Sequence, residues 1–212
     1  MGQLEQPLQT YLDALAAGQP APGGGSAAAL VGALAAALNS MVANFTVGRE
    51  KFAAVQDDVQ AALVECERLR GELQGLVQAD TEAYGMVAAS YKLPRETEAQ
   101  KLGRTLAIQS ALKSAVQVPM AAARACHLVL LWSAELADKG NPNLITDAGV
   151  AAKFALAGLE CAILNAEVNL VNMTDTTYVS ACQNELEALV EESETLAREV
   201  WHKVIRAVRK AK

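Results

Sequence analysis

Alanine occupies 42 of the 212 positions of the chain, whereas aromatic residues make up only 4%. Alanine is the residue that most favours an α-helix, while β-strands are enriched in β-branched and aromatic residues. The sequence therefore predicts an all-α protein whose helices approach closely. A composition of 52% hydrophobic and 20% charged residues excludes a disordered chain, and the length is sufficient for one domain with a substantial core.

The charge and the cysteines limit the partners and the compartment of the protein. A formal net charge of −6 argues against nucleic acid as a partner, because binding phosphates requires a concentrated basic surface. Residues 1–18 lack the basic region of a signal peptide. The cysteines are scattered without a C-x-x-C pair, so we expect buried free thiols in a reducing cytoplasm. They are Cys66, Cys126, Cys161 and Cys182.

A stretch of twenty residues, from Ser26 to Phe45, contains no charged side chain. Twenty apolar residues are enough to cross a membrane as a helix. However, alanine is only weakly hydrophobic, Asn39 and Asn44 would be costly in lipid, and no arrangement of Lys and Arg sets an orientation. We therefore favour a central helix that other helices bury on all sides, and we expect no membrane partner.

The chain as a whole predicts a single domain over residues 1–212, built as a bundle of six or seven helices. Forty residues of helix before Pro94 would extend about 60 Å, so we expect a kink at Gly71 or Gly75. Pro119 predicts the start of a separate helix, because proline cannot donate a hydrogen bond inside a helix. The predicted helices cover residues 4–18, 26–46, 53–93, 97–116, 119–139, 147–173 and 176–212.

The segment Ala21–Ser26 is the most unusual local feature, because three consecutive glycines lead directly into a helix. Glycines allow close approach of the backbone to a ligand, and the N–H groups at a helix N-terminus favour an anion. The segment is not a Walker loop, since it lacks the Gly-Lys-Ser/Thr ending. The alternative is a flexible connector in which Ser26 caps the helix.

Two acidic residues lie on apolar faces of predicted helices. The neighbours of Asp80 at helical spacing are Leu76, Val77, Ala83 and Tyr84, and Glu167 is similarly surrounded. Burial raises the pKa of a carboxyl group into the range that is useful for proton transfer. Asp80 is therefore a candidate catalytic acid, and the alternative is a structural ion pair with an arginine of another helix.

Asn165, Asn169 and Asn172 form one polar stripe on an otherwise apolar helix. Such asparagines either bridge helices or bind a hydrogen-bonding heterocycle. His127 lies among apolar residues with no second ligand at metal-binding spacing, so we interpret it as a core or interface histidine with a hydrogen-bond partner. The sequence predicts no metal site.

In these features the chain resembles the C-terminal domain of formiminotransferase-cyclodeaminase, a family that includes stand-alone bacterial methenyltetrahydrofolate cyclohydrolases. The resemblance runs in order along nearly the whole chain. It departs from the family at Arg95, where a lysine is expected, and at Glu167, where relatives carry an apolar residue. The matching segments are Ala21–Ala29, Met41–Val42, Gly48–Arg49, Asp80–Tyr84, Leu93–Arg95, Ala115–Pro119, Gly140–Asn141, Asp147–Lys153, Leu164–Asn165 and Asn169–Leu170.

The resemblance implies an all-α subunit, commonly a homodimer, that acts on a folate carrying a one-carbon unit. The cyclodeaminase closes 5-formimidoyltetrahydrofolate to 5,10-methenyltetrahydrofolate and releases ammonia, whereas the cyclohydrolase interconverts the methenyl form and 10-formyltetrahydrofolate. The resemblance also implies that Asp80 is catalytic. The formiminotransferase portion is absent from this sequence, so we expect no transferase role.

Together these observations predict a cytoplasmic, dimeric folate enzyme that needs no metal or nucleotide cofactor. The helix start at Gly23–Ser26, with Arg49, Lys51 or Arg95, could hold the anionic glutamate tail of the folate, and Asn165 and Asn169 could bind the pterin. The complete predicted substrate-binding set is Pro22, Gly23, Gly24, Gly25, Ser26, Arg49, Lys51, Tyr84, Arg95, Asp147, Asn165 and Asn169.

The sequence does not choose between ammonia release and hydrolysis, because one acid and one pocket could serve both reactions. The alternative from another class is a catalytically inactive folate-binding or interaction protein with the same fold. Retention of Asp80 and of the glycine-rich segment argues against that alternative.

Overall fold

A computed structural model describes residues 2–210 of the chain. Within this range the protein contains six α-helices and three short 3₁₀ helices and no strand, which confirms the predicted all-α class. The α-helices are α1 (Leu8–Ala16), α2 (Gly24–Asn44), α3 (Gln56–Tyr91), α4 (Glu98–Lys139), α5 (Ile145–Leu170) and α6 (Thr176–Lys210). The 3₁₀ helices are η1 (Gln3–Glu5), η2 (Glu50–Val55) and η3 (Pro142–Leu144).

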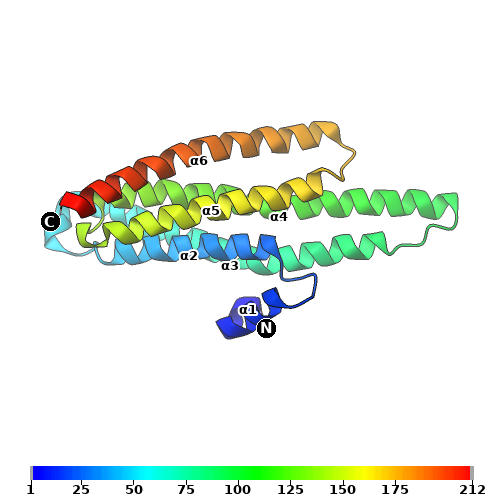
Figure 1. Cartoon of the computed structure of the whole chain (residues 1–212), viewed down its shortest axis with the longest axis horizontal. Coiled ribbons are helices and arrows are strands. Elements are labelled where there is room, and N and C mark those ends of the chain that lie inside the picture. Colours follow the sequence, from blue (N-terminus) through cyan, green and yellow to red (C-terminus); the bar gives the residue numbers. More distant parts are fainter. Residues whose placement is uncertain (1, 211–212) are drawn as a thin grey trace.

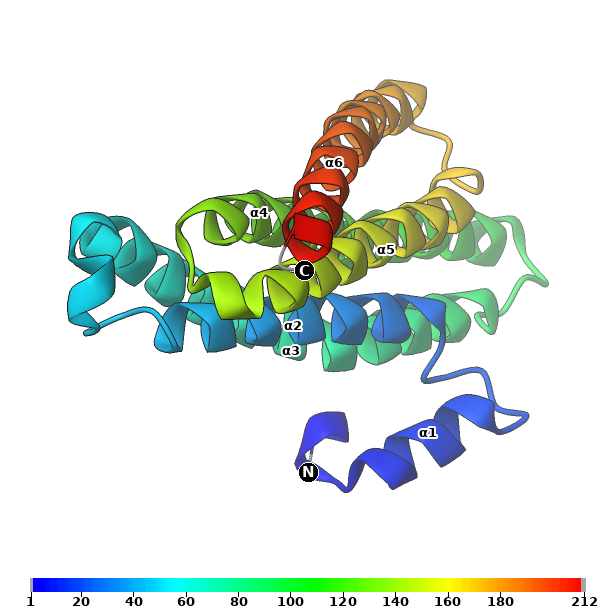
Figure 2. The same ribbon diagram turned by 60° about the vertical axis from the view of Figure 1, so that its left-hand side comes forward.

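Helices α2, α3, α4 and α5 form an elongated bundle in which α2 and α4 each lie between α3 and α5 and also contact each other across the bundle. Helix α6 lies across α4 and α5, and the short α1 lies beside the bundle near the start of α2 (Figures 1 and 2). The end of α3 and the beginning of α4 project beyond the bundle as a two-helix arm (Figure 1). The arm, α5 and the start of α2 therefore meet at one end of the bundle.

Helix α2 is largely buried in the bundle, as its uncharged sequence predicts. Both α2 and α4 are long and apolar enough to cross a membrane, but 61% of the apolar window of each is buried inside the protein. The amide of Asn39 in α2 donates to the carbonyl of Val129 at 2.9 Å and to the hydroxyl of Ser133 at 3.0 Å, both in α4. Its polar side chain therefore joins two helices rather than facing lipid.

Small residues allow α2, α4 and α5 to meet at one point. A Cβ atom added to Gly32 of α2 would lie 2.5 Å from the sulfur of Cys126 in α4, and one added to Gly158 of α5 would lie 2.9 Å from it. Real Cβ atoms do not approach sulfur so closely, so both positions require glycine at this helix separation. The alanine-rich composition thus corresponds to closely approaching helices.

Two predicted interruptions of the helices, the kink at Gly71 or Gly75 and the helix start at Pro119, are wrong. Helix α3 continues through Gly71 and Gly75 without a kink; the irregular backbone lies before it, at Phe52 in η2 (φ −114°, ψ 19°). Helix α4 is one helix that contains Pro119, not two helices that meet there. Proline removes one hydrogen bond from a helix, but Pro119 is buried among the other helices, and this packing maintains the helix on both sides of it.

The cysteines and His127 fall mostly where they are expected. All four cysteines are free thiols, and Cys66, Cys126 and Cys182 are buried; Cys161 is exposed on α5, which corrects its predicted burial. Burial raises the pKa of Cys66 and of Cys126 to about 12. The buried His127 has its Nδ1 2.9 Å from the hydroxyl of Ser193, so the prediction of a core histidine with a partner is confirmed.

Candidate active site

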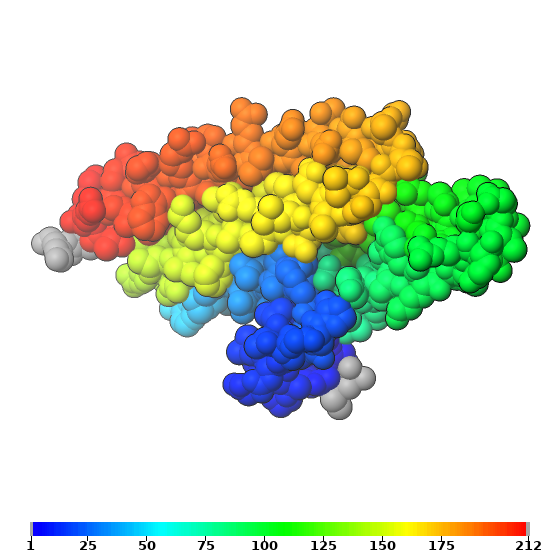
Figure 3. Space-filling view, turned by 45° about the vertical axis from the view of Figure 1, so that its right-hand side comes forward, coloured from blue at the N-terminus to red at the C-terminus, as the bar shows by residue number. Residues whose placement is uncertain are grey.

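A cleft of about 300 Å³ opens where the arm, α5 and the start of α2 meet. Figure 3 shows the surface hollowed in this region, between α5, the start of α2 and the arm. Backbone atoms of the glycine-rich segment form one wall, and side chains of α3, α4 and α5 form the others. The lining residues are Pro20, Ala21, Gly23, Gly24, Gly25, Asp80, Ala83, Tyr84, Val87, Tyr91, Leu112, Ala115, Asn165, Val168, Asn169 and Asn172.

Asp80 is the one acidic residue among the described residues that line the cleft. Its Oδ2 accepts a hydrogen bond from the backbone N–H of Ser26 at 2.9 Å, in the first turn of α2. Burial raises the pKa of Asp80 above its ordinary value of 3.8, and the Ser26 N–H partly opposes this rise. Within residues 2–210 no group donates a hydrogen bond to Oδ1, which leaves that oxygen available to a ligand.

Gly25 is required for this position of the carboxylate. A Cβ atom on Gly25 would lie 2.1 Å from Oδ1 of Asp80, inside any possible contact distance. Helix α2 begins at Gly24 with Gly23 as its N-cap, so the alternative in which Ser26 caps the helix is wrong. Because Ser26 lies inside the first turn, its N–H is one of the unpaired donors of the helix N-terminus, and Asp80 binds it.

Asn165 and Asn169 line the opposite wall on α5, and Asn172 lines it just after the end of that helix. Each amide nitrogen donates to a carbonyl of the preceding helical turn: Asn165 to Cys161 at 2.7 Å, Asn169 to Asn165 at 3.0 Å. The side-chain oxygens of Asn165 and Asn169 are thereby left as acceptors. These residues do not bridge helices, so the interpretation as ligand-binding asparagines is the one that agrees with their positions.

The third wall is one face of α3. Asp80, Tyr84, Val87 and Tyr91 follow one another at spacings of four, three and four residues, which places them in a row along the helix. Asp80 and Tyr84 are among the site residues predicted from the sequence, whereas Val87 and Tyr91 are not. The same periodicity, continued for two more turns, would have identified both.

Several predicted site residues lie elsewhere. Arg49 and Lys51 follow the C-terminal end of α2, which is about 30 Å long, so they are separated from the glycine-rich segment by the full helix. Asp147 lies in the first turn of α5, about 27 Å along the helix from Asn165. Arg49, Lys51 and Asp147 therefore do not lie beside the glycine-rich segment, contrary to the prediction.

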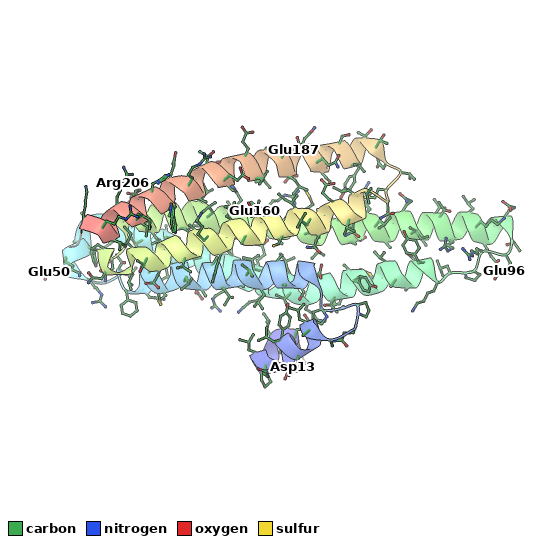
Figure 4. All side chains as sticks on the ribbon, in the orientation of Figure 1. Asp13, Glu50, Glu96, Glu160, Glu187 and Arg206 are labelled. Carbon is green, nitrogen blue, oxygen red and sulfur yellow. The ribbon has the colours of Figure 1, made fainter. Side chains whose placement is uncertain are left out.

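Pro22 is buried behind the cleft wall, and Arg95 lies exposed in the loop between α3 and α4. Figure 4 marks Glu50 and Glu96, the sequence neighbours of Arg49 and Arg95, at opposite ends of the molecule. None of the three alternative cations for the anionic tail, Arg49, Lys51 and Arg95, lines the cleft within one chain.

The second candidate acid, Glu167, lies outside the cleft and accepts a hydrogen bond from the amide of Gln183 in α6 at 2.9 Å. At the outer end of the cleft, Arg104 of α4 donates to the backbone carbonyl of Tyr91 at 3.0 Å. Its guanidinium also stacks over the ring of Tyr91 at 5.6 Å. The cleft therefore contains an acid at its inner end and a cation beside its outer end.

A helical bundle with a single partly buried carboxylate, bound to a helix N-terminus inside a cleft, defines the structural class of this protein. Comparison with known proteins gives the family. Residues 7–188 match the family model described as formiminotransferase-cyclodeaminase. The chain belongs to the formiminotransferase-cyclodeaminase family, which confirms the resemblance found in its motifs.

A bacterial and an animal relative are similar to this chain over nearly all of its residues, but they differ in their own length. The methenyltetrahydrofolate cyclohydrolase of Methylorubrum extorquens is 42% identical over 197 residues, which cover 93% of this chain and 95% of that protein. The formimidoyltransferase-cyclodeaminase of Rattus norvegicus is 35% identical over 196 residues, which cover 92% of this chain. The chain spans only 36% of the length of the rat protein.

A solved structure has the same fold. The crystal structure of formiminotetrahydrofolate cyclodeaminase from Thermotoga maritima matches with a TM-score of 0.80 and 29% sequence identity, over 98% of each chain. This agreement over almost the whole of both chains confirms the all-α architecture.

Proposed function

We propose that this protein is a folate enzyme that hydrolyses 5,10-methenyltetrahydrofolate to 10-formyltetrahydrofolate, and that the same site cyclises 5-formimidoyltetrahydrofolate with release of ammonia. The names of its relatives support the substrate class. The observation that carries the proposal is the position of Asp80. Its carboxylate lies in the wall of the cleft, accepts a hydrogen bond from the N-terminus of α2 and has a raised pKa.

In the hydrolysis, water attacks the carbon between N5 and N10, which carries positive charge as an amidinium. The ionised Asp80 stabilises this charge and accepts the proton of the attacking water. The bond from this carbon to N5 then breaks, and N5 takes up the proton that Asp80 accepted. The hydroxyl left by the attacking water loses its remaining proton to solvent as the carbon–oxygen double bond forms. The carbon therefore remains on N10 as a formyl group, and Asp80 ends the cycle ionised.

In the cyclisation, N10 attacks the carbon of the protonated formimidoyl group on N5 (N5–CH=NH2+), and the bond from this carbon to the resulting amino group then breaks. Asp80 accepts the proton of N10 and gives it to the departing ammonia. We propose hydrolysis as the principal reaction, because the relative named as a cyclohydrolase is 42% identical to this chain, whereas the Thermotoga cyclodeaminase, which also matches over almost its whole length, is 29% identical. The cyclodeaminase name of the Thermotoga structure supports the cyclisation as the second candidate.

The walls of the cleft suggest how the folate lies. Asn165 and Asn169 offer acceptor oxygens that suit the amino and N–H groups of a pterin. Tyr84 and Tyr91 are half-exposed in the cleft and provide flat surfaces for an aromatic ring. Arg104, beside Tyr91 at the outer end, replaces Arg49 and Lys51 as the cation for the glutamate tail.

The proposed reactions need neither a metal nor a nucleotide cofactor. The reacting carbon is already an electrophilic amidinium, and each step requires only proton transfer by one carboxylate. Four free thiols suit a reducing compartment, so we propose a cytoplasmic location.

We also propose a homodimer. Helix α5 carries an exposed apolar row in which Leu164 is 70% and Val168 is 61% accessible, and Val168 also lines the cleft. Leu34 of α2 and Phe45, the residue directly after α2, are also exposed. They are eleven residues or about three helical turns apart and so lie on one side of this helix, which packs beside α5. Exposed rows of large apolar side chains on adjacent helices are typical of a protein interface.

One experiment separates the candidate functions. Purified protein is incubated with each folate, with and without a metal chelator, while the absorbance of the methenyl form and the ammonia concentration are followed. Loss of the methenyl form identifies hydrolysis, and growth of both signals from the formimidoyl substrate identifies cyclisation. Turnover that is equal with chelator supports the cofactor-free mechanism. Binding of either folate without any turnover would contradict the proposal and favour an inactive binding protein.

A further inference from the structure

Tyr11 of α1 is buried against the two helices that form the inner end of the cleft. Its side chain is only 4% accessible, and its ring packs in one cluster with Ala29 of α2 and Val77 of α3. Both neighbours lie close to the site along their helices. Ala29 comes three residues after Ser26, and Val77 comes three residues before Asp80. Leu15, one turn further along α1, packs against the same cluster.

The hydroxyl of Tyr11 lies 3.1 Å from the hydroxyl of Ser26, which is 0% accessible. The Ser26 hydroxyl donates in turn to the side-chain oxygen of Gln3 at 3.3 Å, so the hydroxyl of Tyr11 is the donor to Ser26. Burial raises the pKa of Tyr11, which keeps this donor protonated. Ser26 is therefore fixed from behind by its side chain while its N–H binds Asp80.

Gln3 connects this network to the helix that carries the acid. Its amide donates to the hydroxyl of Thr81 at 2.9 Å, and Thr81 is the residue after Asp80. The first turn of α2 and the turn of α3 around Asp80 are thus joined twice: directly through Ser26 and Asp80, and indirectly through Gln3 and Thr81. On the side away from the cleft, the side chains that make these connections are Gln3 and Tyr11, which both belong to the N-terminal segment of residues 3–16.

We propose that Tyr11 is a positioning residue for Asp80. Tyr11 acts through Ser26, whose hydroxyl it contacts and whose N–H binds the carboxylate. This inference rests on the proposed function of Asp80. Tyr11 does not line the cleft, so it does not contact the substrate. Its role is to hold the first turn of α2 at the distance at which Ser26 donates to the carboxylate.

The variant Tyr11→Phe tests this role, because it keeps the ring between α2 and α3 and removes only the hydroxyl. Without that donor the first turn of α2 is less restrained, and the hydrogen bond from Ser26 to ionised Asp80 weakens. We expect kcat to fall about 3- to 10-fold, the range that corresponds to one lost hydrogen bond, with KM unchanged. The pKa of Asp80 rises, because the bond that is weakened favours its charged form.

The matched control is Tyr178→Phe, which removes a hydroxyl that contacts Gln117 outside the cleft. Ser26→Ala removes the next group of the network and keeps the backbone N–H, so it should reproduce the effects of Tyr11→Phe. The double variant should be no worse than either single variant, because both changes interrupt the same chain of bonds. Circular dichroism confirms that each variant is folded.

The carboxyl group of Asp80 is titrated by carbon-13 NMR in the wild type and in each variant, alongside the pH profile of kcat. An upward shift of the Asp80 pKa in Tyr11→Phe and Ser26→Ala, absent from Tyr178→Phe, supports the proposal. An unchanged Asp80 pKa and wild-type kcat in folded Tyr11→Phe would overturn it. If the wild type turns over neither folate, the proposed function fails, while the NMR titration still decides whether Tyr11 positions Asp80.

Discussion

Two opposing effects act on the ionisation of Asp80. Burial in the cleft raises its pKa, and the N–H of Ser26 stabilises the carboxylate and lowers it; burial has the larger effect. The result is a carboxyl group that is more basic than an exposed aspartate. This combination suits a group that must both accept a proton and release it within one cycle.

The raised pKa predicts the pH dependence of hydrolysis. Asp80 must be ionised to accept a proton from water, so kcat/KM falls as the pH decreases through the pKa of Asp80 in the free enzyme. The midpoint of this acid limb should lie above 3.8, the ordinary value for aspartate. Initial rates measured across the acid range check the expectation. An acid limb at or below 3.8 would show that the titrating group is not a buried Asp80.

A methyl group at Gly25 should displace the catalytic carboxylate. The Cβ of Gly25→Ala would lie 2.1 Å from Oδ1 of Asp80, so either the carboxylate or the start of α2 must move. A displacement of about 1 Å can cost about 100-fold in rate, and we expect a loss of that order in kcat. Gly71→Ala, with open space around its Cβ, is the control and should retain wild-type kcat. Wild-type kcat in Gly25→Ala would contradict the geometry.

At the scale of elements, the bundle depends on the small residues where α2, α4 and α5 meet. The variant Gly158→Ala places a Cβ 2.9 Å from the sulfur of Cys126 and 3.2 Å from the carbonyl oxygen of Ala28. Overpacking of this kind should lower the free energy of unfolding by about 1–3 kcal/mol. Urea denaturation followed by circular dichroism measures the change.

The opposite change is expected at an exposed glycine of α3. Gly75→Ala meets nothing within 4 Å and replaces the weaker helix former, so it should raise the free energy of unfolding by up to about 1 kcal/mol. If Gly158→Ala and Gly75→Ala change the stability in the same direction, helix propensity rather than close packing determines the effect.

Local patterns predict some elements of this fold and not others. The uncharged run of α2 indicates a buried helix because its alanines are only weakly hydrophobic and its asparagines would be costly in lipid. The spacing of Asp80 and Tyr84 places both on one face of α3. The continuity of α4 through Pro119 depends on packing from neighbouring helices, which no local pattern contains. The prediction that Arg49 lies near Gly25 is wrong for a reason already present in the sequence, because the helix predicted between the two residues separates them.

At the scale of the molecule, the apolar rows on α5 and α2 predict a dimer. Light scattering after size-exclusion chromatography should give twice the chain mass of 22.3 kDa. Leu164→Glu places a charge in the α5 row and should yield monomers. Val64→Glu is the control, since Val64 is 57% exposed on α3, outside both rows, and should leave the dimer intact. A monomeric wild type, or a dimer that Leu164→Glu leaves unchanged, would contradict the proposed interface.

The turnover of Asp80→Asn tests the central claim most directly. Asparagine keeps the shape of the side chain and an oxygen that can accept from Ser26, but it cannot accept a proton. Stability at neutral pH should not fall, because the raised pKa of Asp80 shows that the folded protein favours an uncharged group there. We predict a loss of about 10²- to 10⁴-fold in kcat with both folates and unchanged helicity. Turnover by Asp80→Asn within a few-fold of the wild type would contradict the account.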